Sequence, residues 1–208
     1  KIWNITTQSC IKSIDEHGYV LCLLEFENNM LLSGTSENDI HLWDLTSSIN
    51  QPLFNFTGHQ LWVNCLVKCN DTYFASASND ANIRIWDYLE RKCVSILQGH
   101  IDCVLSLILL QNCNLCSGSA DLTIKIWDWK RKTCINTLQG HTKWVKCLFE
   151  LSDETLLSGS DDKTIKVWKN GNCIKTITGH KHSVRTFCQV NDYYFASGSF
   201  DKTIKLWN

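Results

Sequence analysis

The sequence lacks the features that mark membrane proteins and helical proteins. No apolar run in the 208 residues approaches the roughly 18 residues that are needed to span a bilayer. The longest candidate, from Val104 to Leu110, is interrupted by Ser106. No segment shows a sustained helical period, and Pro52 is the single proline. We therefore expect no membrane insertion and little helix.

An excess of charge of either sign is also missing. Lysine and arginine total 20 against 21 aspartates and glutamates, which leaves a net charge of −1. This balance gives no overall attraction to nucleic acid or to an anionic membrane surface. The chain begins with Lys1 instead of methionine, and no signal-peptide pattern follows. We expect the natural start to be missing, so the N-terminus does not indicate a localisation.

What the sequence does contain is a repeat of about forty residues. Six tryptophans recur at intervals of 39 to 43 residues, namely Trp3, Trp43, Trp86, Trp127, Trp168 and Trp207. Four of them are preceded, 27 residues upstream, by the histidine of a Gly-His pair: His59, His100, His141 and His180. The first unit differs, because His17 is one residue closer to Trp43 and follows Glu16 instead of glycine. A fixed period of this length is typical of repeat architectures.

Apolar and polar residues alternate with a period of two inside each repeat, which is typical of β-strands. Ile165 and Val167, for example, flank Lys166. Each unit is expected to hold four short strands: one after the histidine, one at Ser-Gly-Ser, one ending at the tryptophan and one before the next Gly-His. We predict an all-β domain over 1–208, with repeat units at approximately 4–43, 44–86, 87–127, 128–168 and 169–207.

The repeat closely resembles the WD-repeat family over essentially the whole chain. Trp-Asp stands at Trp43-Asp44, Trp86-Asp87 and Trp127-Asp128, and is replaced at Trp3-Asn4, Trp168-Lys169 and Trp207-Asn208. The resemblance implies a β-propeller of four-stranded blades, about five of which are present.

Two interpretations of the blade number are open. In the first, a strand around Cys10 to Ile14 completes the last blade and closes a five-bladed ring. In the second, the chain is a segment of a larger propeller, most often seven-bladed in this family. An open arc would expose strand edges, which argues for closure or for missing partners. The abrupt ends and the absence of an initial methionine favour the second interpretation.

Each unit also offers serine, histidine and aspartate, the residue types of a hydrolase triad. A catalytic triad is needed once, whereas this set recurs in step with the repeat, so a structural role is favoured. The resemblance implies a hydrogen-bonded Asp-His-Ser-Trp chain in each blade. The full sets are His59, Ser76, Asp80 and Trp86; His100, Ser117, Asp121 and Trp127; His141, Ser158, Asp162 and Trp168; and His180, Ser197, Asp201 and Trp207. In the first unit we expect a weaker network, with Glu37 in the aspartate position beside His17, Ser33 and Trp43.

Cysteine is abundant, and we interpret the twelve cysteines as small hydrophobic residues. Cys116, for example, stands where other units have Leu157 and Ala196. Cys113 and Cys116 form a CxxC pair with no second pair at zinc spacing. We expect no metal, no cofactor and no disulfide, and a reducing compartment, the cytoplasm or the nucleus.

The resemblance further implies that one rim of the propeller binds protein partners. The candidates lie beside the valine that follows each histidine and beside the turn aspartate: Tyr19, Trp62, Asn64, Trp144, Lys146, Lys163, Arg185, Phe200 and Lys202. Trp62 and Trp144 are additional to the repeat tryptophans, and exposed tryptophan is enriched at binding hot spots. The cations of the last two units form a candidate site for an acidic or phosphorylated peptide. The alternative is an ordinary solvated edge, compensated by Asp161 and Asp162.

We therefore expect a non-catalytic interaction scaffold that binds other proteins or peptides and forms part of a larger chain or complex. An RNA- or chromatin-associated assembly factor is the alternative, and the near-zero net charge makes a nucleic-acid partner the weaker hypothesis. An enzyme is disfavoured, since no unique set of acid, base and nucleophile stands outside the repeats.

Overall fold

The computed structural model describes residues 1–27 and 29–208. All regular secondary structure in this part of the chain is β-strand, as the alternating pattern predicts. The described residues contain no helix that is long and apolar enough to cross a membrane.

Five antiparallel sheets follow one another along the described chain, and each is built from consecutive strands. Blade 1 holds β3 (Val20–Glu25), β4 (Met30–Thr35), β5 (Ile40–Asp44) and β6 (Phe54–Phe56). Blade 2 holds β7 (Val63–Lys68), β8 (Tyr73–Ser78), β9 (Ile83–Asp87) and β10 (Lys92–Leu97). Blade 3 holds β11 (Val104–Leu109), β12 (Leu115–Ser119), β13 (Ile124–Asp128) and β14 (Thr133–Leu138). Blade 4 holds β15 (Val145–Glu150), β16 (Leu156–Ser160), β17 (Ile165–Lys169) and β18 (Asn172–Ile177), and blade 5 holds β19 (Val184–Gln189), β20 (Phe195–Ser199) and β21 (Ile204–Trp207).

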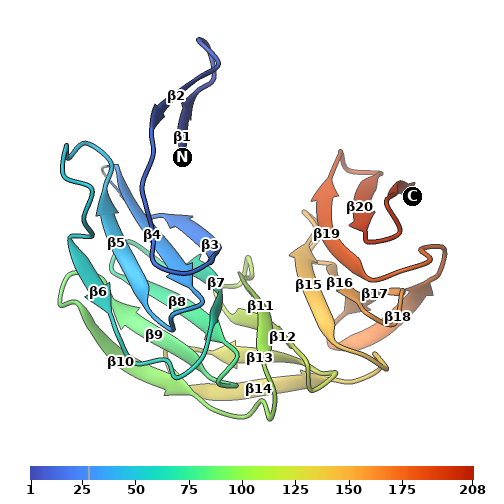
Figure 1. Cartoon of the computed structure of the whole chain (residues 1–208). Coiled ribbons are helices and arrows are strands. Elements are labelled where there is room, and N and C mark those ends of the chain that lie inside the picture. Colours follow the sequence, from blue (N-terminus) through green and yellow to red (C-terminus); the bar gives the residue numbers. More distant parts are fainter. Residues whose placement is uncertain (28) are drawn as a thin grey trace.

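The blades follow one another around an arc, with their first strands on the inside (Figure 1). The first strand of each blade lies beside that of the next, from β3 through β7, β11 and β15 to β19. This is the arrangement of a β-propeller, so the predicted fold class is confirmed. The second, third and fourth strands lie progressively farther out, and the turns between strands form two opposite rims.

The core lies between the blades, because a flat sheet with two apolar faces must bury each face against a neighbour. Phe56 of blade 1 meets Phe74 and Trp86 of blade 2, with ring centroids 5.1 and 5.7 Å apart in edge-to-face geometry. Leu97 packs in the same way in the cluster that holds Trp127. Each fully buried side chain of this size stabilises the fold by about 1.5–3 kcal/mol. The repeat tryptophan thus attaches each of blades 2 to 5 to the blade before it.

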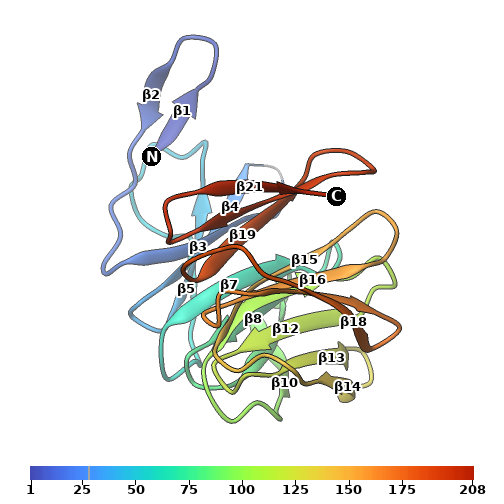
Figure 2. The same ribbon diagram turned by 90° about the vertical axis from the view of Figure 1, so that its right-hand side faces the viewer.

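A two-stranded hairpin, β1 (Ile2–Asn4) and β2 (Ser9–Lys12), precedes blade 1 and projects away from it (Figures 1 and 2). In the described residues β2 pairs with β1 and not with β21, so β21 has only β20 as a hydrogen-bonded neighbour. The pairing expected for a closed five-bladed ring is therefore not formed, and the hypothesis that the segment around Cys10 completes the last blade is wrong for this structure.

Four of the five blades carry a glycine at one position of the second strand, where blade 2 carries Ala77. A Cβ atom on Gly159 would lie 2.6 Å from Cys147 Sγ and 2.8 Å from a methyl carbon of Val184 in the next blade. The equivalent Gly198 of blade 5 has no following blade among the described residues, and a Cβ there would meet only the methyl group of Thr186 at 2.8 Å. The two positions therefore separate the effect of blade packing from the effect of the residue type.

We expect Gly159→Ala to destabilise the protein by about 1–3 kcal/mol, because the added methyl group overpacks the junction with Val184. Urea unfolding of this variant and of Gly198→Ala measures the difference. The Gly198 variant is expected to lose less, and an equal loss in both variants would contradict the packing argument.

Candidate functional site

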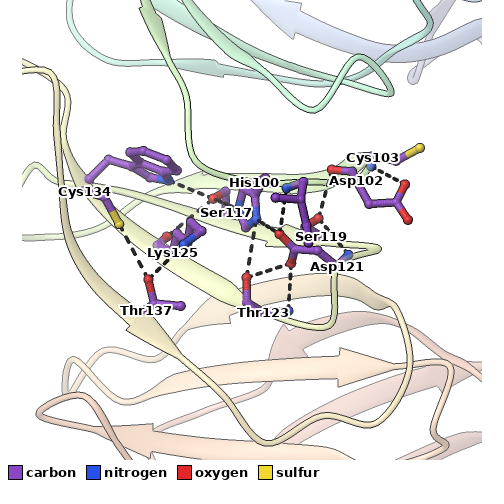
Figure 3. Close-up of polar contacts among 12 residues, drawn as sticks. His100, Asp102, Cys103, Ser117, Ser119, Asp121, Thr123, Lys125, Cys134 and Thr137 are labelled. Atoms are coloured by element: carbon purple, nitrogen blue, oxygen red, sulfur yellow. Dashed lines mark hydrogen bonds and ion pairs between the residues drawn. The ribbon is translucent and has the colours of Figure 1, made fainter.

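A chain of hydrogen bonds crosses blade 3 from its third strand to its rim (Figure 3). Trp127 Nε1 donates to Ser117 Oγ at 2.8 Å, and Ser117 Oγ lies 2.7 Å from His100 Nε2. His100 Nδ1 lies 2.7 Å from Asp121 Oδ2. Because a carboxylate only accepts, His100 donates from Nδ1 and accepts the serine proton at Nε2. Every polar atom along the chain then has a partner.

The same chain of contacts recurs in three other blades. The corresponding distances are 2.6–2.8 Å in blade 2, 2.7–2.8 Å in blade 4 and 2.7–2.8 Å in blade 5. The residues are His59, Ser76, Asp80 and Trp86; His141, Ser158, Asp162 and Trp168; and His180, Ser197, Asp201 and Trp207. The structure therefore brings together all four sets that the resemblance to the WD-repeat family implied.

The turn aspartate fixes two loops of the rim at once. Asp121 Oδ2 accepts from the backbone N–H of Ile101, and Oδ1 accepts from the N–H and the hydroxyl of Thr123 at 2.9 and 2.7 Å. Burial of the carboxyl group opposes its ionisation, but the hydrogen bonds from His100 and Thr123 outweigh burial and hold the pKa of Asp121 well below its usual range. The ionised aspartate is thus stabilised at neutral pH.

These geometries favour a structural role over a hydrolase triad. The side chain of Ser117 is completely buried, and its oxygen is already bonded to an indole N–H and an imidazole. A serine nucleophile must reach a substrate carbonyl, which a buried and doubly bonded hydroxyl does not do.

Blade 1 uses a different set of residues from the one predicted. Glu16, not His17, stands beside the strand serine and the tryptophan: Trp43 Nε1 donates to Glu16 Oε1 at 3.1 Å and to Ser33 Oγ at 2.9 Å, and Ser33 also bonds to Glu16. The second carboxylate oxygen lies 2.6 Å from His41 Nδ1. His17 and Glu37 are exposed and take no part.

The expectation of a weaker network built on His17 and Glu37 was therefore wrong, and a signal for the correct residues was present. Glu16 replaces the glycine of the Gly-His pair, and His41 stands where blades 2 and 3 carry Arg84 and Lys125. Both departures from the repeat lie next to the same serine position. Two substitutions that break the repeat together indicate a compensating pair.

The candidate partner-binding residues lie on the rim that carries the turn aspartates. The backbone N–H of Asp161 donates to the carbonyl of Trp144 at 3.0 Å, which holds the start of β15 beside the turn after β16. Trp144, Trp62 and Tyr19 are 46%, 45% and 74% exposed. Asn64 is instead half-buried, and its amide donates to the Val104 carbonyl at 2.8 Å, so this side chain joins blade 2 to blade 3.

Four of the candidates meet in one hollow of about 430 Å³ between blades 4 and 5. They are Lys146, Lys163, Arg185 and Phe200, and the remaining lining residues are Lys143, Asp161, His182 and Ser183. His182 was missed by the sequence analysis. Lys202 is exposed but does not line the hollow, and Tyr19, Trp62 and Asn64 lie on other blades.

Aromatic rings orient the two central cations of this hollow. Lys146 Nζ lies 4.3 Å from the ring centroid of Trp144, and the Arg185 guanidinium lies 4.4 Å from that of Phe200. Asp161 is the only carboxylate in the lining, 3.7 Å from Lys146. Burial lowers the pKa of Lys146, with a further contribution from the charge of Arg185, and Asp161 compensates only in part. A further anion at this position would be favourable.

The cysteines differ in exposure: two are buried, five are half-buried and five are exposed, so the interpretation as small hydrophobic residues does not describe all of them. All twelve are free, and Cys116 and Cys147 are buried. Burial raises the pKa of the Cys147 thiol to about 12, which makes it unreactive. Cys10, Cys113, Cys134, Cys173 and Cys188 are exposed. Among the described residues, no group of three histidine, cysteine, aspartate or glutamate side chains is placed to hold a metal ion.

We expect His141→Ala to lower the free energy of unfolding by about 1–3 kcal/mol, because the Ser158 hydroxyl loses its acceptor and Asp162 loses its histidine donor, while the bonds from Trp168 and Thr164 remain. Thermal or urea denaturation measures the loss. His182→Ala, at an exposed position outside the networks, is the matched control and should be close to neutral. A His141 variant as stable as the control would argue against the network as a source of stability.

The Glu16–His41 pair predicts a pH-dependent contribution from blade 1. Hydrogen bonding to Glu16 raises the pKa of His41; burial of Glu16 opposes its ionisation, but its bonds to His41 and Ser33 lower its pKa overall. The glutamate's contribution is present above its unfolded pKa of about 4.3 and is lost as the pH falls through the lowered folded value. The histidine's contribution is present below its unfolded pKa of about 6.5 and is lost as the pH rises through the raised value.

Glu16→Gln should therefore destabilise the protein more at pH 5.5 than at pH 9, as measured by urea unfolding at both values. Glu37→Gln, at the exposed acid that does not join the network, serves as the control. A loss from Glu16→Gln that does not change with pH would show that the ion pair contributes nothing.

Several known proteins have segments that are similar to this chain. An uncharacterized WD repeat-containing protein of Schizosaccharomyces pombe is 33% identical over 89 residues, which are 41% of this chain and 24% of the relative. The E3 ubiquitin-protein ligase COP1 of Arabidopsis thaliana is 29% identical over 102 residues, 48% of this chain and 15% of the relative. GID complex subunit 7 of S. pombe is 31% identical over 109 residues, 50% of this chain and 21% of the relative. The matches thus span about a quarter or less of these relatives.

The family model described as "WD domain, G-beta repeat" matches the chain five times. The matched residues are 8–44, 50–87, 91–128, 132–169 and 171–208. Each match ends at the residue after a repeat tryptophan, which also ends or directly follows the third strand of a blade. The chain belongs to the WD domain, G-beta repeat family.

Proposed function

We propose that this protein is a non-catalytic scaffold that binds other proteins or peptides on the rim carrying the turn aspartates. The name of one relative supports this role, since it is a subunit of the GID complex. We further propose that it acts in the cytoplasm or nucleus within a larger chain or complex, in keeping with its free thiols.

The observation that carries the proposal is the hollow between blades 4 and 5. Lys143, Lys146, Lys163 and Arg185 face a single carboxylate, that of Asp161. Clustered cations of this kind recognise phosphate and carboxylate groups, and a guanidinium does so with two parallel hydrogen bonds. The favoured ligand is therefore an acidic or phosphorylated peptide.

The exposed tryptophan beside this hollow supplies apolar contact area. Trp144 lines an adjoining hollow together with Leu122 and Thr142. Lys143 and Asp161 line both this hollow and the cationic one. Tryptophan and arginine are the residue types that dominate binding energy at protein interfaces. A peptide could thus place its anionic group among the cations and an apolar side chain on Trp144.

An RNA- or chromatin-associated assembly factor is the second candidate function. The same cations could bind phosphates of a nucleic-acid backbone, and Trp144 could stack on a base. The affinity for nucleic acid of a site of this kind falls steeply as the salt concentration rises. Binding of an acidic peptide is instead expected to depend on whether the peptide is phosphorylated. The two candidates are therefore separated by a binding experiment that compares peptide and RNA ligands.

We expect the double variant Lys146→Glu, Arg185→Glu to weaken binding of a phosphoserine peptide rich in glutamate by at least about tenfold. The reason is that two attractive charges at the centre of the hollow become repulsive. Fluorescence anisotropy of a labelled peptide measures the dissociation constant, with the unphosphorylated peptide and a single-stranded RNA of equal length as the other ligands.

Lys92→Glu, Lys175→Glu is the matched control, because it makes the same change in net charge at exposed positions away from the hollow. The control should bind as the unaltered protein does. Equal binding by both double variants would rule out this hollow as the site, and stronger binding of RNA than of the phosphopeptide would favour the second candidate.

A further inference from the structure

A second hollow lies on the opposite rim, between blades 2 and 3. Because the strands of each blade are antiparallel, the turn between β7 and β8 and the turn between β8 and β9 lie at opposite ends. The first of these turns contributes Asn70 to the hollow, while the second carries the network residue Asp80. This hollow is therefore separate from the proposed peptide-binding rim.

Blade 2 provides an apolar floor for this hollow, and blade 3 provides much of its mouth. Its volume is about 370 Å³, and its lining consists of Asn70, Tyr73, Ile85, Val94, Ser95, Trp129, Lys130 and Lys132. The rings of Tyr73 and Trp129 meet across the junction with centroids 5.8 Å apart. Ser95 Oγ is buried and has no hydrogen-bond partner within the described part of the chain.

The junction between blades 1 and 2 has a large side chain at the position that corresponds to Ser95. Ser95 lies five residues before His100, and the residue five before His59 is Phe54. The ring of Phe54 packs against the core cluster of blades 1 and 2, with the guanidinium of Arg91 5.4 Å above it. An aromatic ring beneath a cation therefore fits this position of the repeat.

The mouths of the two junctions correspond residue by residue. Arg91 and Lys132 both stand five residues after the tryptophan of their blade, and both have a left-handed backbone, with φ of 52° and 62°. Tyr88 and Trp129 both stand two residues after it, and Tyr88 stacks on Phe26 of the preceding blade at 4.1 Å. The junction between blades 2 and 3 thus retains a cation, Lys132, and an aromatic side chain, Trp129, but has Ser95 in place of the Phe54 ring.

The junction between blades 3 and 4 is closed in another way. The position five residues before the histidine is occupied there by Asn136, and a Cβ atom on Gly171 of blade 4 would lie 2.6 Å from Asn136 Nδ2. The backbone of a shorter turn thus covers the place. Of these three described junctions, the one with Ser95 has a small side chain and no cover.

We propose that the hollow between blades 2 and 3 binds an aromatic side chain of an acidic peptide segment. The ring would take the place that Phe54 occupies in blade 1, between Trp129 and the apolar floor of blade 2. The charged residues of the lining are Lys130 and Lys132, and no acid accompanies them. Carboxylates on either side of the aromatic residue would therefore meet complementary charge at the mouth.

The test uses a blocked peptide with one phenylalanine between glutamates, titrated into the whole chain by calorimetry. A single buried ring with rim charges predicts a dissociation constant of about 0.1–1 mM. Ser95→Phe fills the hollow with the chain's own ring and should weaken binding at least about tenfold. Ser95→Ala leaves the hollow open and should retain the affinity.

Two further variants test the repeat argument and the charge. Phe54→Ser should open the equivalent hollow in blade 1 and create a second site for the peptide. Lys130→Glu, Lys132→Glu should weaken binding several-fold, whereas Lys146→Glu, Arg185→Glu should leave it unchanged, since that pair lies on the other rim.

The indole N–H signal of Trp129, assigned by Trp129→Phe, gives a readout that does not depend on the folding of Ser95→Phe. In a proton–nitrogen correlation spectrum it should shift with saturation as the peptide is added, while those of Trp62 and Trp144 stay in place. Absence of a saturating shift, a shift confined to other tryptophans, or a folded Ser95→Phe that binds like the unaltered protein would overturn the proposal.

Discussion

The hydrogen bond from the indole of the repeat tryptophan to the strand serine is the interaction on which the rest of the structure depends. The indole ring must be buried, because it attaches its blade to the one before, and its N–H needs an acceptor in a place without water. The serine supplies that acceptor and needs one in turn for its own proton. Histidine and aspartate extend the chain of bonds to the rim, where the carboxylate holds two loops in position.

Blade 1 shows that the requirement concerns hydrogen-bonding capacity more than residue identity. Glu16 accepts hydrogen bonds from both Trp43 and Ser33, and His41 on β5 forms an ion pair with its carboxylate. The result is an ion pair within the blade, where the other blades carry a histidine bonded to the turn aspartate. A buried carboxylate is costly unless it is paired and hydrogen-bonded, and both conditions are met here.

Because every blade packs its two faces in a similar way, the blades differ mainly at positions that depart from the repeat. Trp144 and Arg185 make one rim between blades 4 and 5 cationic and aromatic. Ser95 leaves the opposite rim open between blades 2 and 3, where Phe54 closes the preceding junction. The repeat thus provides a rigid frame, and its exceptions provide two chemically distinct surfaces on opposite rims.

The sequence by itself determined the strands and the blades, because the periodicity of two reflects strand geometry and the constant spacing of histidine to tryptophan reflects the repeat. Four of the networks were implied by the resemblance to the WD-repeat family. The sequence did not determine the substitution of Glu16 for His17, since a carboxylate can replace an imidazole only where the fold brings His41 beside it. Nor did it determine the two hollows, or that the β1–β2 hairpin lies apart from β21. Those features arise between blades, where residues about forty positions apart meet, and only tertiary packing decides which side chains fill that space.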